Sequence, residues 1–127
     1  MKPFRRLFLA LILTGASALS AAAEIPFDQK TFDELRGAGK PLVVHVHAVW
    51  CGTCKVQSQI LAPMLASDEF KSLTLLKVDF DKEKPLLRDL KVDDRSTLIA
   101  FQGDKEVARS VADMNKDSIA GLLRKAL

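Results

Sequence analysis

The stretch AVWCGTCKVQ, residues 48–57, contains both cysteines of the chain, Cys51 and Cys54. Two cysteines separated by two residues form a redox-active dithiol, half of a metal site or a structural disulfide. We disfavour the structural disulfide, because a bridge that closes so short a loop adds little stability. The preceding segment PLVVHVHAVW (41–50) is rich in β-branched and apolar residues, which predicts a strand buried on both faces of a sheet. The following segment CKVQSQILAPMLA (54–66) has the apolar spacing of a helix.

Turn and capping residues divide the rest of the chain into short segments. Pro63 is expected to kink or end the helix that follows the cysteines, and Ser67 to cap the short helix after it. This alternation of helices and strands predicts an α/β fold with a central mixed sheet flanked by helices. Helical patterns occupy residues 27–41, 67–73, 82–92 and 115–127, and strand patterns occupy 73–80 and 96–112, the latter with a hairpin turn at Gly103–Asp104.

The first 23 residues have the layout of a secretory signal peptide. A basic start precedes the apolar run 7–13, and small residues lead to Ala23. A membrane anchor is the alternative, but the run is shorter than the about 20 apolar residues that span a bilayer. We therefore expect residues 1–23 to be removed, leaving a domain at 24–127 that is exported across the inner membrane to the periplasm. No stable membrane insertion is expected after cleavage.

Net charge argues against one class of partner. The chain has 19 basic and 16 acidic side chains, but Lys2, Arg5 and Arg6 belong to the predicted signal peptide. Without these three the counts are 16 and 16, so the processed domain is formally neutral. We therefore expect no nucleic-acid partner, because a neutral domain has no basic surplus to offer phosphates.

The string Trp50-Cys51-Gly52-Thr53-Cys54-Lys55, placed after a buried strand, resembles the active-site motif of the thioredoxin superfamily. Two further segments, LKVDFD (76–81) and KVDDRSTLIAFQGDKEV (91–107), resemble the family's next strand and its final hairpin. The resemblance covers most of residues 27–127. It implies the thioredoxin fold and a protein thiol–disulfide oxidoreductase that exchanges electrons with protein disulfides.

The resemblance also implies roles for the motif residues. Cys51 is the expected nucleophile, because a helix N-terminus stabilises its thiolate, and Cys54 is the expected resolving cysteine. Gly52 allows close approach of a substrate backbone, and Thr53 replaces a proline of thioredoxin itself. Both lie between the cysteines and are candidates for tuning the reduction potential. Trp50 is expected to contact the substrate. No dissociable cofactor is expected, since the dithiol carries the electrons.

His45 stands where thioredoxin itself has a buried aspartate, and this departure leaves two interpretations open. A protonated His45 would add positive charge beneath the sulfurs, favour thiolates and make the protein more oxidising. A neutral His45 would be a hydrogen-bonded core residue. His47 lies on the same face of the predicted strand. Lys77, which matches a lysine of the family, is a second candidate for tuning.

Ser96 stands where the family has a cis-proline. We expect a trans Arg95–Ser96 bond, because a cis bond before a residue other than proline costs about 3–4 kcal/mol. The serine would also place a hydroxyl next to the sulfurs. By the resemblance, the Arg95-Ser96-Thr97 loop is the expected substrate-binding segment.

Alternative functions are open at this stage. Cys51 and Cys54, with or without His45 and His47, are suitable ligands for copper or zinc, so a secreted metal-binding module is one of them. A non-catalytic docking domain is another. We prefer the oxidoreductase, as a monomer without bound metal.

The direction of electron flow is a separate question. The pattern ILAPMLASDEFKSL (60–73) resembles the thioredoxin-like domain of membrane electron-transporting thiol reductases. This favours a reductant that receives electrons from a membrane thiol reductase, whereas a protonated His45 would argue for an oxidant.

Overall fold

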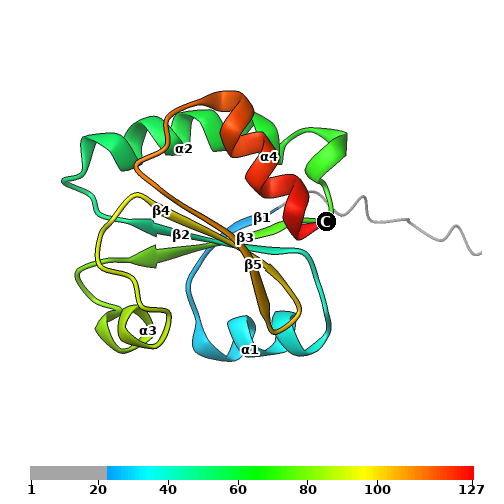
Figure 1. The fold of residues 1–127 in the computed structure, drawn as a ribbon, viewed down its shortest axis with the longest axis horizontal. Coiled ribbons are helices and arrows are strands. Elements are labelled where there is room, and N and C mark those ends of the chain that lie inside the picture. The colour runs from blue at the N-terminus through cyan, green and yellow to red at the C-terminus, as the bar shows by residue number, and fades with distance from the viewer. Residues whose placement is uncertain (1–22) are drawn as a thin grey trace, which may run out of the picture.

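The computed structural model describes residues 23–127, so the predicted signal peptide lies outside the described part apart from its last residue. A five-stranded sheet with the order β1-β3-β2-β4-β5 forms the centre of the molecule (Figure 1). The strands are β1 (Ala23–Pro26), β2 (Leu42–His47), β3 (Thr74–Asp79), β4 (Thr97–Gln102) and β5 (Lys105–Val111), and the helices are α1 (Gln29–Gly37), α2 (Gly52–Leu65), α3 (Lys84–Asp89) and α4 (Lys116–Ala126).

The sheet is mixed, as predicted. β2 pairs in parallel with β3 and antiparallel with β4, and β4 and β5 form the predicted hairpin. The central position of β2 explains its apolar sequence, because both of its faces are covered. Because β2 is the central strand, its C-terminal end and the cysteines that follow lie midway across the sheet, at the side where the parallel strands β2 and β3 both end.

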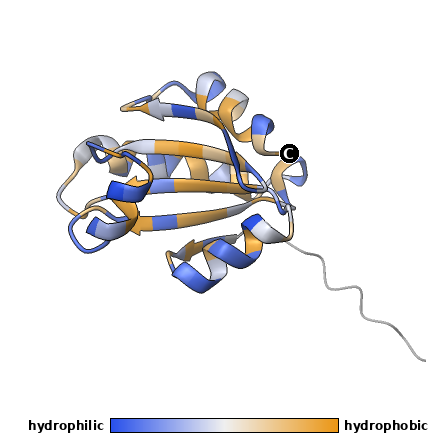
Figure 2. Ribbon diagram, turned by 60° about the horizontal axis from the view of Figure 1, so that its bottom comes forward, coloured by the Kyte–Doolittle hydropathy of each residue, from blue (hydrophilic) through white to orange (hydrophobic). Residues whose placement is uncertain are grey.

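Two helices cover each face of the sheet (Figure 1). On one face Val43 of β2 packs with apolar side chains of α2 and α4, and on the other face Val44 and Val46 pack with those of α1 and α3. Figure 2 shows the same division, with hydrophobic residues concentrated along the strands and hydrophilic ones on the helices and loops. Among the described residues no helix is both long enough and apolar enough to span a membrane.

Strand β1 was not predicted from the sequence. It comprises only four residues and ends in a proline, and it pairs in parallel with β3 at the edge of the sheet. A proline is tolerated there because an edge strand has one side without sheet partners. Its first residue, Ala23, is also the last residue of the predicted signal peptide.

The region after α2 corrects a second expectation. α2 runs through Pro63 and ends two residues later, at Leu65. The predicted helix 67–73 is only a 3-10 turn, Asp68–Phe70, and Ser67 makes no capping hydrogen bond to it. The Ser67 hydroxyl instead donates to the Met64 carbonyl at the end of α2 (2.6 Å).

Candidate active site

Cys51 lies between the end of β2 and the first turn of α2. It is the N-cap residue of α2, and its sulfur accepts a hydrogen bond from the Cys54 backbone N–H (3.2 Å). A disulfide joins the two cysteines, whose Cα atoms are 5.3 Å apart. Cys51 is 6% exposed and Cys54 is fully buried, so an incoming sulfur reaches Cys51 first. The helix N-terminus next to Cys51 favours the negative charge of a thiolate.

Ser96 touches both sulfurs from the loop before β4. Its Oγ is 3.2 Å from Cys51 Sγ and 3.1 Å from Cys54 Sγ. The described residues contain no cis peptide bond, so the expected trans bond at Arg95–Ser96 is confirmed, and the φ of Ser96 is +62°. Its backbone N–H donates to the Val46 carbonyl on β2 (2.8 Å). The loop therefore places the serine hydroxyl, and not a proline ring, against the disulfide.

Gln57 holds this loop from α2, and sequence reasoning missed it. Its side-chain Nε2 donates to the backbone carbonyls of Ser96 (3.0 Å) and Asp113 (2.9 Å). Its Oε1 lies 2.9 Å from Nε2 of His45. Because Oε1 only accepts, His45 carries its proton on Nε2. Gln57 is fully buried. The sequence offers polar neighbours at Ser58 and Gln59, and the available signal for Gln57 was its helical spacing, three residues after Cys54 and four before Leu61.

His45 is neutral at physiological pH. Burial, the largest effect, lowers its pKa from 6.5 to about 4, although the hydrogen bond with Gln57 opposes this and nearby His47 and Lys77 add to it. The interpretation in which a protonated His45 charges the sulfurs is therefore wrong, because the buried ring does not hold a proton on both nitrogens. The Cys54 sulfur lies 3.1 Å from the Ser96 hydroxyl and 3.9 Å from the Val46 carbonyl oxygen, and His45 is not among its described polar contacts.

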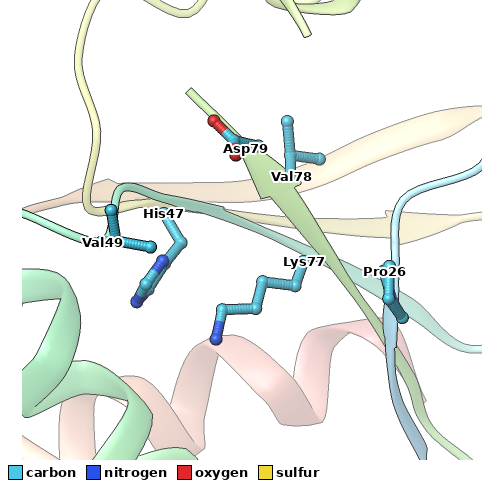
Figure 3. A pocket seen from close by; sticks show the side chains of 6 residues that line it. All are labelled: Pro26, His47, Val49, Lys77, Val78 and Asp79. Atoms are coloured by element: carbon cyan, nitrogen blue, oxygen red, sulfur yellow. The ribbon is translucent and has the colours of Figure 1, made fainter. Parts of the chain in front are cut away.

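His47 and Lys77 line a separate hollow beside the motif. Figure 3 shows both side chains extending from neighbouring strands toward the same space, which Pro26 and Val49 also border. The ammonium group of Lys77 pairs with Glu24 on the edge strand (3.4 Å). Neither cysteine lines this hollow.

The four possible metal ligands are not assembled into a site. Within residues 23–127, no three His, Cys, Asp or Glu side chains lie close enough together to hold an ion. His45 is committed to Gln57, and His47 faces the separate hollow. The geometry therefore gives no support to the metal-binding alternative.

The open side of the disulfide is a shallow hollow whose rim is partly aromatic. Trp50 is 57% exposed, and its ring N–H donates to Asp81 (2.8 Å) while the Arg95 guanidinium lies 4.7 Å from the ring centroid. A substrate segment would meet this surface on its way to Cys51. The hollow is lined by Trp50, Cys51, Gly52, Thr53, Asp94, Arg95, Ser96 and Ala112.

Thr97 does not line this hollow, so the geometry gives no support to the expectation that it contacts substrate. Its side chain is buried, and its hydroxyl donates to the Asp94 carbonyl (2.7 Å). Its backbone position is already paired with Val46 and Val111 in the sheet. Thr97 therefore stabilises the loop from its buried side.

A disulfide between a helix N-cap and a residue of the first turn, with one sulfur near the surface of an α/β sandwich, is the arrangement expected of a thiol–disulfide oxidoreductase. The chain belongs to the thioredoxin family, whose model, described as Thioredoxin, matches residues 24–125. It is 36% identical to a thioredoxin of Chlamydia trachomatis over 97 residues, which are 76% of this chain and 92% of that protein. The sequence resemblance and the mixed-sheet fold that it implied are thus confirmed.

Two further comparisons agree. The chain is 33% identical over 112 residues to a bifunctional thioredoxin reductase/thioredoxin of Mycobacterium leprae, and the match covers 88% of this chain but only 23% of that protein. The crystal structure of Trxlp from Edwardsiella tarda EIB202 superposes with a TM-score of 0.77 at 32% identity, covering 80% of this chain and 98% of the other.

Proposed function

We propose that this protein is an exported reductant of protein disulfides, acting in the periplasm after removal of residues 1–23. The observation that carries the direction is the neutral state of His45. A buried cation beneath the sulfurs would favour the dithiol form and make the protein oxidising. The structure has no such cation at His45, and the nearby Lys77 is paired with Glu24.

The reductive reaction consists of two thiol–disulfide exchanges. The Cys51 thiolate attacks a substrate disulfide, a Cys51–substrate bond forms, and the electron pair of the broken bond leaves with the other substrate sulfur, which takes up a proton. Cys54 then loses its proton and attacks Cys51, which releases the second substrate sulfur. Two electrons pass to the substrate, and the Cys51–Cys54 disulfide remains.

A membrane thiol reductase is the proposed electron donor, because the oxidised protein must be reduced again for each turnover. The resemblance of residues 60–73 to domains of such reductases supports this choice. The Mycobacterium leprae relative is a bifunctional thioredoxin reductase/thioredoxin, so a dedicated donor has a precedent among the relatives. We propose that the exported domain is a monomer.

The reduction potential of the Cys51–Cys54 pair tests the direction. We expect equilibration of the purified 24–127 domain with glutathione at pH 7 to give a value near that of thioredoxin, about −270 mV. A value near about −120 mV would make the protein an oxidant and contradict the proposal.

Export has its own test. In cells that express the full chain, the periplasmic fraction should contain a protein whose N-terminus is Glu24. Recovery of the whole protein in the cytoplasm, with residues 1–23 intact, would contradict the proposed location.

A further inference from the structure

We propose that Ser96 is a catalytic residue whose hydroxyl connects the two sulfurs and stabilises the Cys51 thiolate. The hydroxyl oxygen lies within hydrogen-bond distance of both Cys51 Sγ and Cys54 Sγ. This inference concerns thiol–disulfide exchange itself and holds for either direction of electron flow.

The direction of the hydrogen bond follows from the chemistry of the sulfurs. In the disulfide neither sulfur carries a proton, so the Ser96 hydroxyl must be the donor. Two electrons break the S–S bond, and one proton then resides on Cys54 while Cys51 is a thiolate. The hydroxyl can donate to the Cys51 thiolate and accept from the Cys54 thiol at the same time. One serine can thus serve both sulfurs.

The setting makes this hydrogen bond strong. Ser96 is 3% exposed and Cys54 is fully buried, so little water competes for the hydroxyl. Hydrogen bonds to a charged acceptor are stronger than those to a neutral one, and a water-poor surrounding strengthens them further. The Cys54 backbone N–H donates to the same Cys51 sulfur, so the thiolate has two donors.

The backbone holds the serine in place at a cost. A φ of +62° is in the left-handed region, which is strained for a residue with a Cβ. Three backbone hydrogen bonds offset this strain: the Ser96 N–H donates to Val46, and its carbonyl accepts from Ala112 and from the Gln57 side chain. A glycine would adopt this conformation freely, so the backbone alone does not require a serine.

Two variants separate the hydroxyl from the backbone. Ser96→Ala and Ser96→Gly both remove the hydroxyl, but only glycine also relieves the strain. We would measure the pKa of the Cys51 thiol from the pH dependence of its alkylation in the reduced domain, together with the free energy of unfolding. Asp94 and Arg95, the charged residues in the same hollow, stay unchanged in both variants and pair with each other.

We expect both variants to raise the Cys51 pKa by a similar amount and to slow alkylation below the wild-type pKa about tenfold, which corresponds to about 1.4 kcal/mol. The glycine variant should be the more stable of the two. Ser110→Ala, which removes a buried hydroxyl from β5 away from the sulfurs, is the control and should leave the pKa unchanged.

Two results would overturn the proposal. If the glycine variant has the wild-type thiol pKa, the hydroxyl does not stabilise the thiolate and Ser96 acts only through its backbone. If neither variant shifts the pKa, the serine has no part in exchange. The experiment measures the pKa of the Cys51 thiol and not the direction of electron flow. If the protein proves to be an oxidant, the conclusion about Ser96 is therefore unaffected.

Discussion

Acidification should destabilise the oxidised protein through one buried side chain, His45. Its pKa is about 4 in the folded protein against 6.5 for an unperturbed histidine. Between these values the unfolded chain binds a proton that the folded chain does not, so stability falls as pH falls. Above about pH 6.5 both states are neutral at this position, and the full stability is present. Below about pH 4 both states are protonated, and the loss is complete.

The size of this loss of stability follows from the difference between the pKa of His45 in the folded and in the unfolded protein. At 1.36 kcal/mol for each pH unit, a gap of about 2.5 units gives a total loss of about 3.4 kcal/mol. Most of the loss occurs within an accessible range: from pH 7 to pH 5 it amounts to about 2 kcal/mol. That is a large fraction of the about 5–15 kcal/mol by which typical domains are stable.

Urea unfolding of the disulfide form at pH 7 and pH 5 provides the assay, with His45→Gln as the matched variant. Glutamine keeps an N–H for the Gln57 acceptor but does not titrate. Asp28 and Glu69, whose pKa values are lowered by hydrogen bonds with Thr31 and Arg124, and His47, whose pKa is lowered by burial, are present in both proteins and cancel in the comparison. Wild type should lose about 2 kcal/mol more than the variant between the two pH values. Equal losses would refute the neutral, buried state of His45.

Four substitutions test the rest of the site. Cys51→Ser should abolish reduction of insulin-type disulfides, and retained turnover would contradict its role as nucleophile. Cys54→Ser should accumulate mixed disulfides with exported proteins, and a failure to recover any would count against a substrate-facing role. Gln57→Leu should lower the free energy of unfolding by about 2–4 kcal/mol, because it leaves buried polar groups unpaired. The control Gln59→Leu, on the exposed side of α2, should change it little. Equal effects of the two substitutions would show that the Gln57 side chain does not clamp the Ser96 loop. Ser96→Pro should destabilise the loop, since proline requires a negative φ and has no N–H for Val46, and a variant of wild-type stability would show that the loop rearranges at no cost.

The parts of the fold that the sequence predicted correctly are those with strong local patterns. The β-branched run before Cys51 and the helical run after Cys54 both reflect burial of their own side chains, so their types could be predicted without a tertiary model. β1 has no comparable pattern, because four residues with a terminal proline become a strand only when β3 supplies the partner.

The residues of the site likewise divide into those that a local sequence pattern identifies and those that depend on distant segments. The motif identifies the sulfurs, but the residues around them depend on segments that are distant in sequence. Gln57 is buried because its amide meets carbonyls 39 and 56 residues further along the chain. The charge of His45 had two interpretations until its burial and its Gln57 partner were known, since the same imidazole titrates differently in water and in a core.

His45, Gln57 and Ser96 are best understood as one neutral unit in place of two separate features of the family, the buried aspartate and the cis-proline. His45 fixes the amide of Gln57, the amide holds the Ser96 carbonyl, and Ser96 presents its hydroxyl to the sulfurs. Substitutions at residues that share hydrogen bonds are not additive. The effect of Ser96→Ala on the Cys51 thiol should therefore shrink when Gln57 is already Leu, because a loop without its clamp no longer holds the hydroxyl in place. Full additivity of the two substitutions would mean that the serine is positioned by its backbone bonds to Val46 and Ala112 alone.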